Sequence, residues 1–277
     1  MAEDVRVPLG DLVPTIDPAI IITLGEQADE IAKGVQGNSK RVAMRALGSV
    51  PIALGALAKD VHGQTPSDVI DVLQFALLLE YLESDFYVRG LSAAGLIPAS
   101  DRTVFTTISA HESAHVNVLQ GLIQSKGATP QAKPAFDYTA KGNLPGFAFL
   151  ASQYATFTML AQAFEDTGVR AYKGQVGRLI NDKAALTTAL TIHSVEARHA
   201  CEVRRLRGKK GWITGASRDD LPAFAQGTYD GEDTITQGAV NVSNLATGFG
   251  GADSASEAFD EPLSMAQVTA ILTLFLP

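Results

Sequence analysis

The chain carries two sets of side chains that can bind metal ions, and both sets have the same order and spacing. Each set is a lone glutamate followed by a Glu-x-x-His pair, 32 residues later in the first set and 31 in the second. A helix turns about 100° per residue, so Glu and His at positions i and i+3 lie on one face, one turn apart. Each pair can therefore reach one metal ion. The six residues are Glu80, Glu112, His115, Glu165, Glu196 and His199.

The charge of these side chains predicts two metal ions. Four carboxylates buried together would repel one another and lose their hydration at great cost. Two divalent cations cancel that charge while both imidazoles stay neutral, and one cation does not. Carboxylate with imidazole is a donor set that suits iron or manganese. The expected cofactor is therefore a pair of Fe or Mn ions per chain.

A competing metal-binding motif overlaps the first Glu-x-x-His pair. Residues 111–115 read HESAH, which matches the zinc-protease motif in which two histidines bind zinc and the glutamate activates water. The extended form of that motif needs Gly at 118 and His at 121, where this chain has Val118 and Gly121. It also leaves the second set unexplained, so we favour the two-metal interpretation. His111 is expected either to face away from the site or to lie behind its ligands.

Neighbouring acids compete for the lone-glutamate positions. Glu83 and Asp85 could replace Glu80, but the three leucines before Glu80 favour a deeper position for it. Asp166 adjoins Glu165, which is preferred because of the repeat.

Two tyrosines occupy equivalent positions in the two sets. Tyr87 and Tyr172 each follow a lone glutamate by seven residues, two turns along the same helix face. They could lie beside the ligands, although a tyrosine at helical spacing is more often a core residue with a satisfied hydroxyl.

The sequence predicts four helices that position these residues. Residues 65–68, TPSD, can cap a helix that starts before the apolar run VIDVLQFALLLEYL and ends near 90–95. A second helix is expected from about 100 to 127. Residues 127–146 contain three prolines and predict a long crossover. A third helix is expected from about 146 to 172, followed by a tight turn around GQVG and a fourth helix to about 207.

The flanking regions carry no recognisable chemistry. Residues 1–64 form an N-terminal extension in which 39–58 resemble an export signal, with basic residues ahead of an apolar stretch that Pro51 interrupts. The stretch is too short to span a bilayer, so no transmembrane span is expected, and we favour a retained helix. The location, cytoplasmic or exported, stays open. Residues 208–277 include a stretch from about Gly227 to Ser256 that is rich in Gly, Ser, Asp and Thr, and they predict a loop-rich extension with a short terminal helix.

Composition excludes some classes of function. The formal net charge is −8 and the pI is near 5.1, which argues against a nucleic-acid partner. The single cysteine, Cys201, excludes an intramolecular disulfide and a cysteine-based zinc site.

Three segments resemble ferritin-like domain proteins, a group that includes plant desiccation-related proteins and bacterial relatives. They are LQFALLLEYLESDFY, LAQAFEDTGVRAYKGQ and SVEARHA, and AFDEPLSMAQVTAIL near the C-terminus is similar to bacterial members. The resemblance covers about residues 65–207. It implies an all-α, ferritin-like four-helix bundle with a long crossover between helices 2 and 3, and the six residues above match its ligand positions.

This resemblance leaves the reaction open, because the wider superfamily includes ferroxidases, peroxidases, manganese catalases and oxygenases. We expect redox chemistry on hydrogen peroxide or dioxygen, with catalase-like or peroxidase-like turnover ahead of ferroxidase activity, in protection against stress. The alternative is a metal-binding or desiccation-protective protein without turnover. A homo-oligomer is compatible with either.

Overall fold

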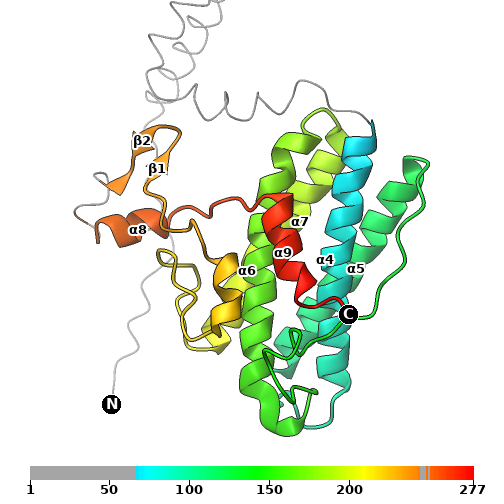
Figure 1. Cartoon of the computed structure of the whole chain (residues 1–277), viewed down its shortest axis with the longest axis vertical. Helices are drawn as coiled ribbons and strands as arrows, with labels where there is room; N and C mark the ends of the chain where they lie inside the picture. The colour runs from blue at the N-terminus through cyan, green and yellow to red at the C-terminus, as the bar shows by residue number, and fades with distance from the viewer. Residues whose placement is uncertain (1–65, 244–247, 249) are drawn as a thin grey trace, which may run out of the picture. The chain divides into compact units, whose positions relative to one another are not determined.

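The four predicted helices form an all-α four-helix bundle, which confirms the expected fold class. The structure is a computed structural model that describes residues 66–243, 248 and 250–277. The elements keep the labels of Figure 1, where the long helices lie side by side. These helices are α4 (Pro66–Ser92), α5 (Arg102–Ser125), α6 (Tyr154–Leu179) and α7 (Lys183–Leu206).

The connections make two hairpins. Residues 93–101 join α4 to α5, and residues 180–182 join α6 to α7. A long crossover, residues 126–153, runs back along the bundle and ends in the short 3₁₀ helix η2 (Ala151–Gln153) (Figure 1). The lone glutamates lie on α4 and α6, and the Glu-x-x-His pairs lie on α5 and α7.

The third helix lies further along the chain than the sequence indicates, and both of its predicted boundaries are wrong. It begins at Tyr154 rather than near 146, and it continues through GQVG to Leu179. Glycine usually weakens a helix interior by about 1 kcal/mol. Packing explains its presence here, because a Cβ on Gly174 would lie 1.9 Å from the carbonyl oxygen of Leu263. The turn instead follows at Asp182, whose side chain caps α7 by accepting from the backbone N–H of Ala185.

The described parts of the C-terminal extension form several short elements, some of which pack on the bundle. Its elements are η3 (Ala223–Thr228), the antiparallel strands β1 (Thr236–Gln237) and β2 (Val240–Asn241), α8 (Ala252–Ser256) and α9 (Met265–Thr273). The backbone N–H of Leu263 donates to the carbonyl of Arg170 at 3.0 Å. Helix α9 packs on α6, where Val268 and Leu272 are buried in the main core (Figure 1).

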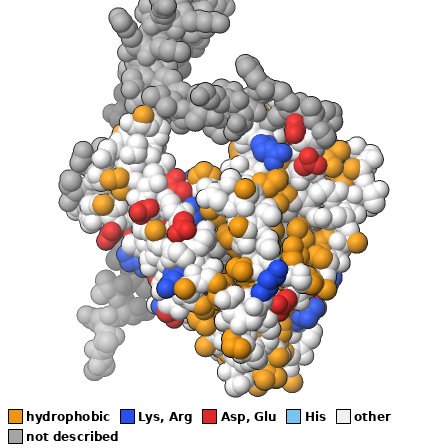
Figure 2. Space-filling model, in the orientation of Figure 1, with side chains coloured by type: hydrophobic (Ala, Val, Ile, Leu, Met, Phe, Trp, Pro, Cys, Tyr) orange, Lys and Arg blue, Asp and Glu red, His pale blue; other side chains and the backbone are white. Residues whose placement is uncertain are grey.

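The helices of the described part were compared with the requirements of a membrane span. Among residues 66–243, 248 and 250–277, no helix combines the length and apolar character that a membrane span needs. Apolar side chains are frequent on the visible face of the bundle, with scattered charged groups between them (Figure 2). The signal-like segment 39–58 lies outside the described residues, and the proposed boundaries at 64/65 and 207/208 stay predictions.

Candidate metal centre

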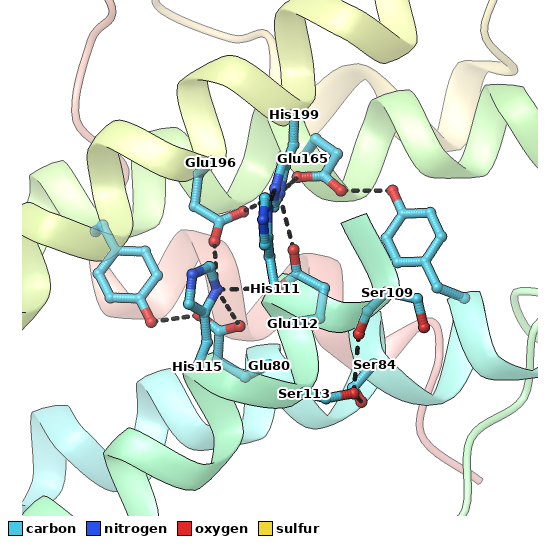
Figure 3. Close-up of polar contacts among 12 residues, drawn as sticks. Glu80, Ser84, Ser109, His111, Glu112, Ser113, His115, Glu165, Glu196 and His199 are labelled. Carbon is cyan, nitrogen blue, oxygen red and sulfur yellow. Dashed lines mark hydrogen bonds and ion pairs between the residues drawn. The ribbon is translucent and has the colours of Figure 1, made fainter. Parts of the chain in front are cut away.

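The bundle brings all six predicted residues together in its interior (Figure 3). They form two groups of four donors, and the donor atoms within each group lie within 4.8 Å of one another. Glu112 and Glu196 belong to both groups, and every member is buried. The first group adds Glu80 and His115, and the second adds Glu165 and His199. The structure therefore has two overlapping carboxylate and histidine groups, an arrangement consistent with a two-metal site.

Each imidazole points one nitrogen at three carboxylates. Nδ1 of His115 lies 3.2 Å from Oε2 of Glu80, 3.3 Å from Oε2 of Glu112 and 3.1 Å from Oε1 of Glu196.

The second imidazole repeats this arrangement. Nδ1 of His199 lies 2.8 Å from Oε1 of Glu112, 3.3 Å from Oε2 of Glu165 and 3.8 Å from Oε2 of Glu196. One ring nitrogen has a single lone pair or a single proton, so it cannot satisfy three carboxylates.

Several of these atoms lack hydrogen-bond partners, which tests whether the residues fit metal ions. Although Nδ1 of His199 is close to Glu112, it makes no hydrogen bond there, and neither oxygen of Glu196 is satisfied. Oε1 of Glu112 and Oε2 of Glu165 are also buried without a partner. A buried charged group needs a partner, and metal coordination is one of the few that proteins use. The donor set therefore fits a pair of hard cations.

The electrostatics of the metal-free side chains lead to the same conclusion. Burial favours neutral imidazole, yet contacts with Glu112, Glu196 and Glu80 raise the pKa of His115 to about 12. The pKa of His199 is also raised, despite burial, by the surrounding carboxylates. Burial and the charges of Glu196 and Glu80 raise the pKa of Glu112. Without metal, the cluster must take up protons to reduce its negative charge, whereas two bound cations would replace those protons.

The two tyrosines of the repeat reach the lone glutamates across the bundle. The hydroxyl of Tyr87, on α4, donates to Oε1 of Glu165 on α6 at 2.5 Å. The hydroxyl of Tyr172, on α6, donates to Oε1 of Glu80 on α4. The sequence puts each tyrosine on the same face as the glutamate of its own helix, two turns further along, and in the structure each one donates to the glutamate of the other hairpin. Both hydroxyls are satisfied, and both fix the orientation of a proposed ligand.

His111 lies behind a proposed ligand, one of its two predicted positions. Its Nδ1 is 2.9 Å from Nε2 of His199, and the two rings stack with centroids 5.2 Å apart. His111 belongs to neither donor group, so among the described residues HESAH does not bring its two histidines to one metal position. The contact occupies the nitrogen of His199 that faces away from the carboxylates and orients the ring.

The competing acids have other partners. Asp85 binds Arg89 and Lys133, each at 2.6 Å, on the outside of α4. Asp166 accepts a hydrogen bond from Tyr229 at 2.7 Å.

Glu83 is different from these acids. It is only 2% exposed, and burial together with the charges of the four cluster glutamates raises its pKa. Sequence reasoning treated it as a rival of Glu80, although its i+3 spacing allows both residues to face the site.

Comparison with known families agrees with the fold and the cluster. The ferritin-like domain matches residues 68–209, which include all six clustered residues and the four long helices except the first two residues of α4. The chain belongs to the ferritin-like domain family. A search of curated proteins gives no match to it.

Proposed function

We propose that this protein binds two iron or manganese ions and uses them for redox chemistry on hydrogen peroxide or dioxygen in protection against stress. The observation that carries the proposal is the pair of overlapping donor groups, with Glu112 and Glu196 common to both. Glu112 and Glu196 would contribute to both metal positions. Glu80 and His115 would complete one position, and Glu165 and His199 would complete the other.

The residues around the cluster support a reactive site rather than a purely structural one. When bound, the two ions would supply the electrons that peroxide or dioxygen accepts. The chain contributes a buried interior and two tyrosine hydroxyls that hold the lone glutamates in place. Catalase-like or peroxidase-like turnover ranks ahead of ferroxidase activity, by analogy with the fold class.

The alternative is a protein that binds the same ions without turnover. The resemblance of LQFALLLEYLESDFY and SVEARHA to desiccation-related proteins supports a protective role, which could rest on holding metal ions. Both candidates use the same six residues, so only an activity measurement separates them.

The test begins with metal analysis of protein produced with iron and with manganese. We expect about two ions per chain, and a content near zero would refute both candidates. Oxygen evolution or peroxide consumption by the loaded protein would support the enzyme, and two bound ions without turnover would support the alternative. Glu196→Ala should abolish binding and activity while the helical circular dichroism persists. Glu202→Gln, a change of a partly exposed glutamate on the same helix, is the control.

A further inference from the structure

A cavity of about 150 Å³ lies between α6, α7 and the C-terminal extension. None of the six clustered glutamates and histidines lines it, so it is separate from the candidate metal centre. A cavity of this size can hold a small organic molecule, about as large as benzene. Its walls include Asp166, Val169, Ala197, Trp212, Ile213 and Asp260.

One carboxylate of the cavity is deeply buried and keeps an oxygen available to a ligand. Asp166 is only 3% exposed, and its Oδ2 accepts a hydrogen bond from Tyr229 at 2.7 Å. Its Oδ1 lies 3.5 Å from Nε of Arg204, and this Nε has no hydrogen-bond partner. Arg204 is therefore close to Oδ1 but does not satisfy it with a hydrogen bond.

The charges around the cavity do not balance. Arg204 also pairs with Asp219, with Nη1 3.0 Å from Oδ2, so one guanidinium serves two carboxylates. Asp260 adds a third carboxylate, which forms no salt bridge within the described part of the chain. The ammonium group of Lys173 binds the backbone carbonyl of Asp260 rather than its side chain. Three carboxylates thus face two cations, and a ligand with one positive charge would balance them.

The other walls favour an organic cation over a metal ion. Within the described residues, both groups of donors that could hold a metal belong to the candidate metal centre, and neither includes Asp166 or Asp260. Val169, Ile213 and Ala197 offer apolar surface, which suits an alkyl group. Trp212 adds an indole, the side chain that attracts cations most strongly.

We propose that this cavity binds a small primary alkylammonium ion. Its N–H groups donate to Oδ1 of Asp166 and to the carboxylate of Asp260, and its alkyl part packs against the apolar wall. A quaternary ammonium ion fits less well, because proteins bind such ions in cages of several aromatic rings and this wall has one. The site is independent of the proposed metal chemistry.

Trp212 provides the test, because it is the only tryptophan of the chain. The full chain is titrated with n-butylammonium chloride while the fluorescence of Trp212 is recorded. Two parallel titrations use 1-butanol, which has a similar size and no charge, and sodium chloride at the same ionic strength. We expect a saturable change with n-butylammonium alone. A response that does not saturate, or an equal response to butanol or sodium chloride, would overturn the proposal.

Asp260→Asn removes a proposed partner of the ammonium group and should weaken n-butylammonium binding about tenfold or more. The matched control is Asp253→Asn, because Asp253 is an exposed aspartate of α8 that does not line the cavity. Its affinity for n-butylammonium should equal that of the wild type. Equal affinities in the two variants would contradict a role for Asp260.

A second variant fills the cavity and leaves its charges intact. Ala197 is an exposed residue of α7 in the cavity wall, so Ala197→Leu should preserve the helix and occupy part of the space. We expect circular dichroism like that of the wild type and loss of the saturable fluorescence change. Undiminished n-butylammonium binding in Ala197→Leu would show that the ligand binds elsewhere and would refute the site.

Discussion

The hydroxyl of Tyr87 donates a 2.5 Å hydrogen bond to Oε1 of Glu165, which belongs to the other helical hairpin. Tyr172 makes the reciprocal contact with Glu80. Each hairpin thus orients the lone glutamate of the other one. This exchange connects the two halves of the bundle at the point where the proposed metal ions would bind.

Tyr87→Phe should weaken the metal centre without disrupting the helices. The change leaves Oε1 of Glu165 buried and without its donor, which should lower the free energy of unfolding by about 1–3 kcal/mol. Loss of such an orienting partner should also weaken metal binding by about 10–100-fold. Thermal unfolding and metal titration measure these two effects. Tyr154→Phe is the matched control, because Tyr154 donates a 2.5 Å hydrogen bond to Asp101 outside the cluster. Equal metal affinity in both variants would contradict the orienting role.

Addition of manganese or ferrous ions should stabilise the protein. The cations relieve the repulsion among the buried carboxylates and bind only the folded state, which should add about 2.7 kcal/mol at a concentration of about one hundred dissociation constants. Thermal unfolding with and without metal, after treatment with a chelator, measures the increase. Glu112→Gln removes a carboxylate common to both donor groups and should abolish most of the increase in stability. If Glu112→Gln gains as much stability from metal as Glu202→Gln does, the cluster is not where the ions bind.

Gly174→Ala should detach the segment that follows α8 from the bundle. The added Cβ would overlap the backbone carbonyl of Leu263, which cannot move without loss of its neighbouring hydrogen bond to Arg170. We expect a lower melting temperature and faster proteolysis of the C-terminal extension. Gly121→Ala is the control, because a Cβ at this exposed position of α5 meets no atom within 4 Å. That change should stabilise the protein by about 0.5–1 kcal/mol through helix propensity. Similar effects of the two substitutions would argue against close packing at Gly174.

Glu232 should make stability depend on pH. Its Oε1 lies 2.7 Å from Nε of Arg170 and accepts from the backbone N–H of Glu261 at 2.6 Å. Burial nevertheless raises the pKa of Glu232 from 4.5 to about 7. The folded protein therefore holds this proton more tightly than the unfolded chain does. The resulting stability is present below about pH 4.5 and is lost as the pH rises through about 7.

Glu232→Gln isolates this contribution, because the amide resembles the protonated acid and does not titrate. Denaturant unfolding of both proteins across the pH range from 4.5 to 7 provides the comparison. Wild-type stability should fall relative to the variant as the pH increases. A difference in stability that stays constant across that range would refute the raised pKa.

The repeated spacing of the glutamates and histidines determined which six side chains share the interior, and the family resemblance indicated the same bundle. Helical periodicity is a local property, so the sequence was sufficient to predict which residues share a face. The four helices and the long crossover follow from capping residues and prolines, which also act locally. The end of α6 was missed because Gly174 is retained in the helix by a contact with Leu263, 89 residues further along the chain.

The sequence by itself thus determined the fold class and the set of side chains that meet at the candidate metal centre. Only the tertiary structure decided that each tyrosine binds the glutamate of the opposite hairpin, that His111 stacks on His199, and that the carboxyl group of Glu83 lies next to Gly168. The physical reason is that these relationships are distances between helices. They depend on how closely the packed helices approach each other and on which side chains leave room, and the spacing of residues along one helix does not contain that information.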